Sequence, residues 1–313
     1  MGKIFNGIDE LVGNTPLVAL HHIEKKLKLK AHIFGKCECY NPAFSVKDRI
    51  AKRMLAKVPP KQITKNTVFV EATSGNTGIG LAALCASKGY KLVIIMPENS
   101  TKERIMLIRH FGAEVILTPA QDGMKGAVQK AHILQEKNKN VIILNQFENE
   151  ANVEAHTLTT ATEILSDTQG NIDALVAGVG TSGTLTGTAR ALKTCIPDLC
   201  VVAVEPKSSP LLSSGKAGPH KIPGIGANFV PPFFDKTLVD EIIPISNEDA
   251  VKGAEMSAKL EGLAVGISAG AALMAAVTLA KRPEMTGKNI VVIFPDLVER
   301  YLSMGYFGVS TSS

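Results

Sequence analysis

Short runs of β-branched and aliphatic residues alternate with longer stretches of helical periodicity along most of this chain. Strands are predicted at 67–71, 92–96, 114–117, 141–144, 174–177, 201–204 and 291–294. Helices are predicted around 81–86, from 100, around 124–135, up to about 192, around 249–260 and after 268. Because parallel strands need helical crossovers that cover both sheet faces, this repetition predicts an α/β fold with mostly parallel, twisted sheets.

The length of the chain allows two domains. Its 313 residues, of which 45% are hydrophobic, can fill two cores of ordinary size. The Ser-, Gly- and Pro-rich stretch 207–232 breaks the alternation, and long irregular stretches inside compact chains are more often functional than linkers. We expect two α/β domains with a cleft between them, and ligands at the carboxyl ends of the strands.

Charge and aromatic content exclude a typical nucleic-acid-binding protein. Lys and Arg number 34 against 29 Asp and Glu, a net charge of +5, and the basic residues lie singly among acidic ones. Nucleic-acid sites need a clustered basic face, and single-stranded bases need aromatic side chains. The chain has no Trp and only four Tyr, so we expect no nucleic-acid partner.

Cysteine and histidine usage predicts no metal site. The five cysteines form no CxxC pair and are odd in number, and the seven histidines are scattered apart from His21 and His22. A reducing compartment fits this cysteine usage best. The N-terminal MGKIFNGIDELVGNTP lacks the apolar stretch of a signal peptide, and no apolar run reaches the roughly 18 residues of a membrane span. We expect a cytoplasmic protein without a membrane partner.

The loop at 177–184, AGVGTSGT, follows a predicted strand and precedes a predicted helix. Unpaired backbone N–H groups and the helix dipole at such a start can bind a phosphate without any cation. The same residues satisfy the dinucleotide fingerprint GxGxxG, and Glu205 follows at the distance of a ribose-binding carboxylate. This loop alone leaves a nicotinamide cofactor and a phosphorylated cofactor of another kind both open.

Two further motifs bear on the choice. TSGNTG at 73–78 also lies between a strand and a helix, and its hydroxyl, amide and N–H groups can bind a carboxylate. Its alternative is an Asn-centred turn in which Ser or Thr caps the helix.

Lys47 follows the loop NPAFSV and precedes the helical stretch 50–58. Most lysines are solvated, but one partly buried here could have a lowered pKa and condense with an aldehyde.

Together these motifs resemble the cysteine synthase (O-acetylserine sulfhydrylase) branch of the fold-type II pyridoxal-phosphate (PLP) enzymes, the tryptophan synthase β-like group. The resemblance extends from about residue 8 to about residue 303. In chain order the motifs are LVGNTPL at 11–17, SVKDR at 45–49, TSGNTG at 73–78, NQFEN at 145–149, GVGTSGT at 178–184, PHKI at 219–222, GIGA at 224–227, GIS at 266–268 and ERYLS at 299–303. Each is weak alone, but the ordered set is specific.

The resemblance implies a fold and a division of the chain. Each of two domains would be a mostly parallel twisted sheet flanked by helices, with PLP in the cleft between them. Residues 35–148 would form an N-terminal, partly mobile domain that closes over the substrate. Residues 1–34 and 149–313 would form the domain that holds the cofactor phosphate. Both boundaries are approximate.

The resemblance also implies roles for individual residues. Lys47 would form the Schiff base to PLP and act as general base, and Asn76 would bind the 3′-oxygen of the pyridine ring. The 5′-phosphate would be held by Gly180, Thr181, Ser182, Gly183 and Thr184. The substrate would be bound by Thr73, Ser74, Gly75, Thr77, Gln146, Gly224 and Asn228. Ser268 would face the pyridine nitrogen, which favours β-elimination over transamination, and it could also be a helix N-cap.

The implied reaction is β-replacement through an aminoacrylate intermediate, in which O-acetyl-L-serine and sulfide give L-cysteine and acetate. Alternatives on the same scaffold are L-cysteine desulfhydration and β-replacement with another thiol, such as cystathionine or lanthionine synthesis. A nicotinamide oxidoreductase is a lower-ranked alternative. The family implies a homodimer, and some of its members bind the C-terminal tail of serine acetyltransferase.

Several positions depart from the usual pattern of the family. Asn228 stands where Gly is typical, Pro223 where Gln is common, Glu150 where Pro is common, and Val298 where Gly is common. Ser182 also replaces a Gly in the phosphate loop, although its backbone N–H remains. Asn228 matters most for specificity because the family places this loop beside the substrate, where loop side chains tune the choice of reaction.

Overall fold

The structure of the chain is a computed structural model that describes residues 4–307. These residues form two compact units, each built from two separate segments of the chain. Unit 1 contains the described residues up to Val12 together with Asn41–Asn152, and unit 2 contains Gly13–Tyr40 together with the described residues from Val153 onward. The domain boundaries implied by the resemblance, after residues 34 and 148, stay a prediction.

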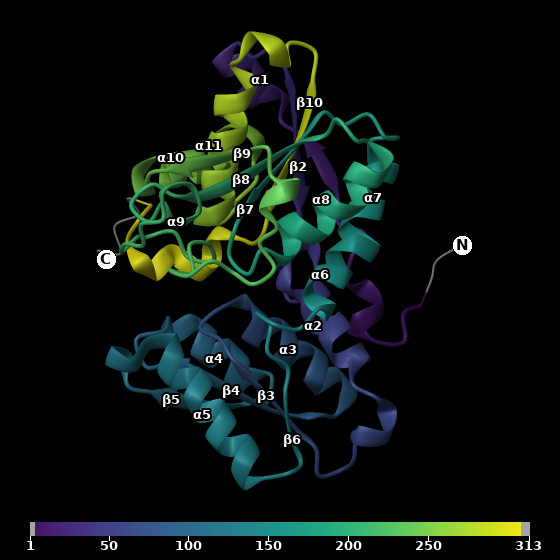
Figure 1. The fold of residues 1–313 in the computed structure, drawn as a ribbon, viewed down its shortest axis with the longest axis vertical. Helices are drawn as coiled ribbons and strands as arrows, with labels where there is room; N and C mark the ends of the chain where they lie inside the picture. The colour runs from purple at the N-terminus through teal and green to yellow at the C-terminus, as the bar shows by residue number, and fades with distance from the viewer. Residues whose placement is uncertain (1–3, 308–313) are drawn as a thin grey trace. The chain divides into compact units, whose positions relative to one another are not determined.

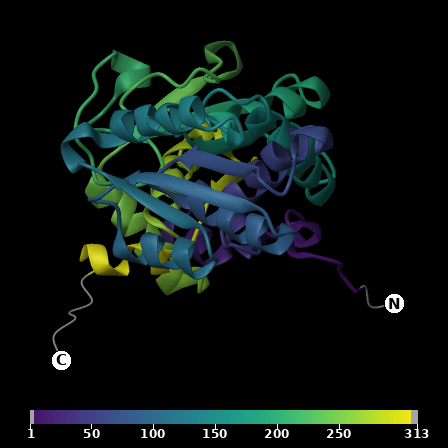
Figure 2. The same ribbon diagram turned by 90° about the horizontal axis from the view of Figure 1, so that it is seen from below.

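Unit 1 is built around a parallel sheet (Figure 2). The sheet has four strands in the order β5-β4-β3-β6. Its strands are β3 (Val68–Ala72), β4 (Lys91–Pro97), β5 (Glu114–Thr118) and β6 (Val141–Ile143). Its helices are α2 (Lys47–Lys57), α3 (Asn76–Lys88), α4 (Lys102–His110) and α5 (Gly123–Lys137). Short 3-10 turns lie at Ile8–Leu11, Pro60–Gln62 and Ala120–Asp122.

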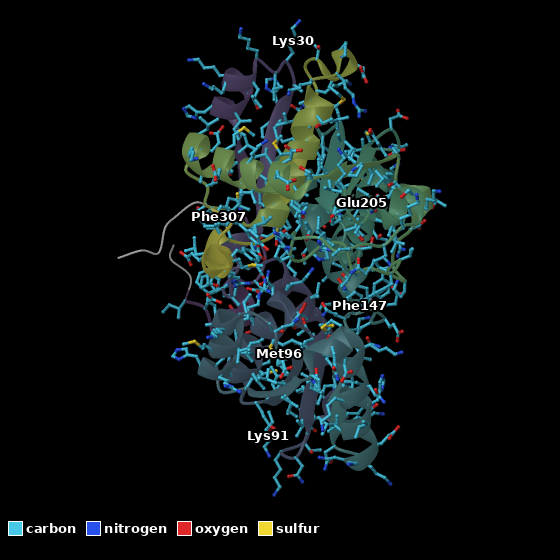
Figure 3. All side chains as sticks on the ribbon, turned by 90° about the vertical axis from the view of Figure 1, so that its left-hand side faces the viewer. Lys30, Lys91, Met96, Phe147, Glu205 and Phe307 are labelled. Atoms are coloured by element: carbon cyan, nitrogen blue, oxygen red, sulfur yellow. The ribbon has the colours of Figure 1, made fainter. Side chains whose placement is uncertain are left out.

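Helices cover both faces of the unit 1 sheet, so β4 is a continuous apolar run. On one face Ala127 and Ala131 of α5 pack against Val70 and Val93. On the other face α3 contacts β4, and α2 and α4 pack against α3. Met96 is fully buried in β4, whereas Lys91 at the start of the same strand reaches solvent (Figure 3).

Unit 2 contains a six-stranded sheet in the order β1-β2-β10-β7-β8-β9, parallel except for the edge strand β1 (Figure 1). The strands are β1 (Leu17–Ala19), β2 (His32–Cys37), β7 (Ala174–Gly178), β8 (Cys200–Pro206), β9 (Glu241–Ile245) and β10 (Asn289–Phe294). The α-helices are α1 (His21–Leu27), α6 (Ala151–Ala155), which begins in unit 1, α7 (Ala161–Asp167), α8 (Gly183–Cys195), α9 (Leu211–Ser214), α10 (Asn247–Glu261) and α11 (Ile267–Ala280). A π-helix covers His156–Thr160, and 3-10 turns lie at Glu38–Tyr40, Lys236–Leu238, Pro283–Met285 and Val298–Met304.

Alternate residues of the unit 2 strands point to opposite cores. In β7, Val176 faces the core made with α10 and α11, whereas Leu175 faces the core made with α7 and α8. Helices α10 and α11 approach closely because Gly253 and Gly270 lie at their crossing, where an added Cβ would meet the backbone of the other helix. Both faces of the sheet are therefore buried, as a parallel sheet requires.

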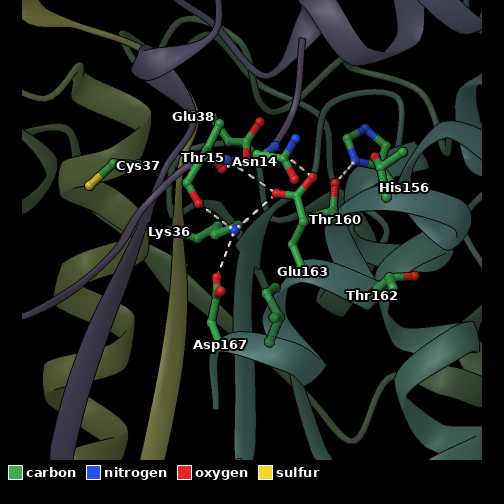
Figure 4. Close-up of polar contacts among 12 residues, drawn as sticks. Asn14, Thr15, Lys36, Cys37, Glu38, His156, Thr160, Thr162, Glu163 and Asp167 are labelled. Carbon is green, nitrogen blue, oxygen red and sulfur yellow. Dashed lines mark hydrogen bonds and ion pairs between the residues drawn. The ribbon is translucent and has the colours of Figure 1, made fainter. Parts of the chain in front are cut away.

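A buried cation joins the early and late segments of unit 2. Lys36 of β2 is fully buried, and its Nζ lies 3.0 Å from Glu163 and 3.1 Å from Asp167 of α7 (Figure 4). The same Nζ donates to the carbonyl oxygen of Thr15 at 2.6 Å. Glu163 in turn accepts from the backbone N–H of Asn14 at 2.9 Å. This network fixes the segment before β1 against α7.

The strands and helices predicted from periodicity are all present in the structure. The prediction did not include β1, β2, β9, α1, α9 or the helices within 151–167. In β2 the residues Gly35 and Lys36 interrupt the apolar run, and Pro244 interrupts β9. Within the irregular stretch 207–232, only the short helix α9 forms. Across residues 4–307 there is no helix with the length and apolarity needed to cross a membrane.

Candidate active site

Lys47 is the first residue of α2, and its side chain is half-buried. The preceding loop is held tightly by the buried Asp48, whose carboxylate accepts the backbone N–H of Ala43 at 2.6 Å. Asp48 also packs under Gly80 of α3, where an added Cβ would lie 3.1 Å from its Oδ1. Because Asp48 locks the loop onto α3, the position of Lys47 is fixed relative to that helix.

The loop at 73–78 joins the end of β3 to the start of α3. Asn76 is the first residue of α3, and the N-cap is Gly75, with no side-chain cap among the described residues. The Thr73 hydroxyl instead accepts the backbone N–H of Gly75 at 3.2 Å. The alternative in which Ser or Thr caps this helix is therefore wrong, because Thr73 bonds within the loop.

Thr77 and Gln146 come together although the two residues are 69 positions apart in sequence. The Thr77 hydroxyl donates to the side-chain oxygen of Gln146 at 2.6 Å, and both side chains are buried. On the other side of the loop, Arg104 of α4 donates to the carbonyl oxygen of Ser74 at 3.3 Å. These contacts hold the hydroxyl and amide groups at the start of α3, where the positive end of the helix dipole favours an anion.

The glycine-threonine loop of unit 2 joins β7 to α8. Thr181, Ser182 and Thr184 are buried at the start of this helix. Gly180 has no room for a side chain, because an added Cβ would collide with the carbonyl oxygen of Gly224. Ser182 adopts a left-handed backbone with φ of 69°, which explains why Gly is usual there, and its hydroxyl lies 3.0 Å from that of Thr186.

His156 is a part of this site that the sequence analysis missed. Its Nε2 lies 3.2 Å from the Thr184 hydroxyl. Its Nδ1 lies 2.9 Å from the Thr160 hydroxyl (Figure 4). The residue is fully buried and begins a π-helix, a distortion that is frequent at functional sites. A lone histidine in a helical stretch carries no signal of this contact, because the contact depends on a residue 28 positions later.

Ser268 lies in the first turn of α11 and is buried. An added Cβ on Gly224 would lie 3.9 Å from its hydroxyl oxygen, so Ser268, Gly224 and Gly180 form one cluster in unit 2. The interpretation of Ser268 as an N-cap is wrong. The helix begins at Ile267, and its N-cap is Gly266, which lies against Asp296 and Tyr301 with no room for a side chain.

The backbone explains the Asn at position 228. Asn228 has a left-handed φ of 61°, a conformation that Gly adopts freely and that Asn tolerates better than most residues. Its side-chain oxygen accepts the Ser209 hydroxyl at 2.9 Å. The Asn side chain is exposed and holds the irregular loop.

Glu205 is committed to a structural role. Its buried carboxylate accepts the backbone N–H of Leu212 at 2.7 Å and that of Ser213 at 3.1 Å. It therefore caps the short helix α9. This use of both oxygens disfavours the ribose-binding role that a nicotinamide cofactor would require.

The predicted site residues fall into two groups. Unit 1 holds Lys47, Thr73, Ser74, Gly75, Asn76, Thr77 and Gln146, and unit 2 holds Gly180, Thr181, Ser182, Gly183, Thr184, Gly224, Asn228 and Ser268. In residues 4–307, no three His, Cys, Asp or Glu side chains gather in an arrangement that could hold a metal ion.

Comparison with known proteins identifies the class to which this site belongs. The model of the pyridoxal-phosphate dependent enzyme family matches residues 8–296, and the chain belongs to this family. It is 46% identical over 306 residues to cysteine synthase B of Campylobacter jejuni, covering 97% of this chain and 99% of the relative. The family predicted from the sequence motifs is thereby confirmed.

Two solved structures share the fold. The crystal structure of cysteine synthase from Entamoeba histolytica has a TM-score of 0.94 and 40% sequence identity, covering 99% of this chain and 93% of that one. A hydrogen sulfide-producing enzyme from Fusobacterium nucleatum has a TM-score of 0.91 and 43% identity, covering 96% and 99%. The predicted fold class, of α/β sheets as in fold-type II PLP enzymes, is confirmed.

The residues of unit 2 fit the phosphate of PLP. The close approach of Gly180 to Gly224 leaves a cradle lined by backbone, and three buried hydroxyl residues stand beside it at the start of α8. A helix of this length contributes partial positive charge at its first turn. The cradle can thus bind a phosphate dianion with neutral groups alone.

Proposed function

We propose that this chain is a PLP-dependent cysteine synthase that converts O-acetyl-L-serine and sulfide into L-cysteine and acetate. One observation carries the proposal: Lys47, Asn76 and Gly183 of the three separated motifs each begin an α-helix. Helix starts favour anions, and a PLP enzyme acting on an amino acid must bind a phosphate, a phenolate oxygen and a carboxylate. The relatives of the same length and fold support this reaction.

In this proposal each group has a defined task. PLP, when bound, supplies an electron sink that acidifies the Cα proton of the amino acid. Thr181, Ser182 and Thr184 hold its phosphate, and Asn76 binds its ring oxygen. Ser268 would hydrogen-bond the ring nitrogen, because a neutral hydroxyl accepts or donates a hydrogen bond without imposing a charge.

The substrate-binding group lies in unit 1. Thr73, Ser74 and Thr77 at the start of α3, together with Gln146, bind the α-carboxylate by hydrogen bonds. Lys47 would hold the cofactor through its Nζ, and the same amine would take the proton from Cα of the bound amino acid. The net change at Cβ is loss of acetate with the C–O electron pair and formation of a C–S bond by sulfide, and Lys47 would return the proton to Cα.

A second candidate, L-cysteine desulfhydration, is favoured by two observations. Asn228 adds a polar side chain to the 224–228 loop where Gly is typical, and one structure of the same fold belongs to a hydrogen sulfide-producing enzyme. β-Replacement with another thiol, giving cystathionine or lanthionine, uses the same first half-reaction. The specificity of the second half-reaction would separate these activities.

Initial rates decide between the candidates. The purified holoenzyme is given O-acetyl-L-serine with sulfide, and in a separate assay L-cysteine alone, while cysteine and sulfide are measured. We expect the synthesis rate to exceed the sulfide release rate by at least about tenfold, since synthesis is proposed as the main reaction. A dominant rate on L-cysteine alone would overturn the proposal in favour of desulfhydration.

We also propose that the protein is a cytoplasmic homodimer. All five cysteines are free thiols, three of them buried, which suits a reducing compartment. Binding of a serine acetyltransferase C-terminal tail is a further proposal taken from the family resemblance. Light scattering of the holoenzyme, with and without a peptide of that tail, would test both.

A further inference from the structure

A buried carboxyl lies beneath the loop that carries Gln146. Glu71 is the penultimate residue of β3 and is 1% exposed. Beside it, β3 and β6 pair in parallel register, with Val70 opposite Ile143, and their last backbone bond runs from Leu144 N–H to Val70 at 3.0 Å. Asn145 then adopts a left-handed φ of 53°, which turns the chain out of the sheet.

Beyond Leu144, where the backbone pairing of β3 with β6 ends, the next hydrogen bond is made by the side chain of Glu71. Its Oε1 accepts the backbone N–H of Gln146 at 3.3 Å, across 75 positions of sequence. On the opposite side of the same residue, Asn152 donates its side-chain amide to the Gln146 carbonyl oxygen at 2.8 Å. The backbone N–H and the backbone carbonyl oxygen of Gln146 are thus both hydrogen-bonded. These two bonds fix the position of its Cα, from which the side chain starts.

The fixed backbone position of Gln146 determines where its side-chain amide points. Its side-chain oxygen accepts the Thr77 hydroxyl at 2.6 Å, and Gln146 is only 6% exposed. If the N–H of Gln146 were released, the left-handed turn at Asn145 could relax, and the amide would move away from Thr77. The contact between two substrate-binding residues therefore depends on a third residue that lies below them.

The charge state of Glu71 suits this task. Burial raises its pKa to about 8, and the backbone N–H groups of Gln146 and Asn145 lower it only in part. At neutral pH the carboxyl is largely uncharged, and among residues 4–307 its Oε2 has no hydrogen-bond partner. A neutral carboxyl that accepts through one oxygen resembles a glutamine amide in shape and in hydrogen bonding.

We propose that Glu71 is a positioning residue for substrate binding, which sets the orientation of Gln146 toward Thr77 through the backbone N–H of Gln146. The inference rests on the proposed function, because only that function assigns Gln146 and Thr77 to the α-carboxylate. Glu71 itself touches neither substrate nor cofactor. Its action should appear in substrate affinity rather than in the chemical step.

Three variants of the holoenzyme test the proposal. E71A removes the acceptor, E71Q keeps a neutral acceptor of the same length, and V93A removes buried side-chain volume from the neighbouring strand without touching the turn. We expect E71A to raise KM for O-acetyl-L-serine roughly tenfold, with kcat within about threefold, since one buried hydrogen bond is lost. E71Q should restore KM to within about twofold, and V93A should leave it unchanged.

Amide hydrogen exchange provides a readout that needs no substrate. In E71A the N–H of Gln146 should lose protection at least about tenfold relative to Leu144, whereas E71Q and V93A should keep it. Unchanged protection in E71A, or an equal rise of KM in V93A, would overturn the positioning role. If the wild-type enzyme makes no cysteine from O-acetyl-L-serine, the proposed function fails, and the exchange measurement still decides whether Glu71 holds the turn.

Discussion

At the scale of single residues, the proposed chemistry depends on a lysine that is neither fully buried nor freely solvated. Lys47 begins α2 and is half-buried, and the loop before it is locked by Asp48. Such a position lets the amine reach a ligand while its backbone stays fixed. The role of Lys47 stays a prediction, and the structure shows that the Asp48 carboxylate holds the loop before it.

Removal of the Lys47 amine is the first test at this scale. K47A should lose both cysteine synthesis and the visible absorbance of a Schiff base, since no other amine is proposed to bond the aldehyde. The absorbance spectrum and the initial rate are measured on the same preparation. K52A, which changes a lysine one turn later on α2, serves as the control, and turnover retained by K47A would contradict the mechanism.

The second prediction concerns pH and Glu71. Its pKa is about 8 in the folded protein, raised by burial above the ordinary 4.5. Between these two values the unfolded chain releases the proton and the folded chain keeps it, so this group lowers the free energy of unfolding as pH rises. The free energy of unfolding falls by up to ~1.4 kcal/mol per pH unit in this range. Below the lower pKa and above the higher one, Glu71 adds no further pH dependence to the free energy of unfolding.

E71Q should therefore lose part of the pH dependence of stability. Urea unfolding at intervals between pH 5 and pH 8 should show a shallower decline for E71Q than for the wild type. Parallel curves for the two proteins would mean that the Glu71 carboxyl is ionised in the folded state, contrary to the effect of burial.

At the scale of elements, the phosphate cradle depends on close backbone approach at the start of α8. Gly180 lies against Gly224, and Gly187 in the second turn lies against the carbonyl oxygen of Val153 and the side chain of His156. Helix α8 can therefore pack against the π-helix only because residue 187 is a glycine. A methyl group at either position must displace backbone, which is less adaptable than a side chain.

G180A should weaken PLP binding by roughly tenfold or more while the fold is kept, because overpacking of this kind typically costs about 1–3 kcal/mol. PLP content after dialysis, read from absorbance, is the measurement. G262A is the matched control, because it makes the same change at a glycine that has open space around it. Gly262 is the C-cap of α10 and has a left-handed φ of 69°. It should reduce stability by about 1 kcal/mol and leave PLP content unchanged, and equal PLP loss in both variants would refute the cradle.

At the scale of the whole molecule, each unit is assembled from segments that are distant in sequence. In unit 2, β2 from the early segment pairs with β10 near the end of the chain. The buried Lys36 of the early segment also makes polar contacts to Glu163 and Asp167 of the late segment (Figure 4). A buried ion pair contributes little net stability when intact, but loss of one partner leaves buried charge behind.

K36M should destabilise the protein by about 3 kcal/mol, the lower end of the usual range, because the Asp167 side chain is 39% exposed and can be hydrated. K88M removes a comparable pair, Lys88 with Asp9 at 2.8 Å, whose side chains are 34% and 30% exposed. It should cost less than about 1 kcal/mol. Urea unfolding of both variants is the measurement, and equal losses would show that burial of Lys36 is energetically unimportant.

The sequence alone determined the class of fold, the positions of most strands and helices, and the cofactor. The fold class and the elements are encoded locally, because β-branched runs make strands and small residues between a strand and a helix leave N–H groups free for an anion. The cofactor follows only from the ordered set of separated motifs and the family that they resemble. The tertiary structure alone decided that β2 lies inside the unit 2 sheet and that Thr77 meets Gln146. It alone also decided that Glu71 accepts from the Gln146 N–H and that His156 contacts Thr184. These contacts join positions far apart in the chain, and they exist only because side chains meet across strands and helices, which the periodicity of a single segment does not record.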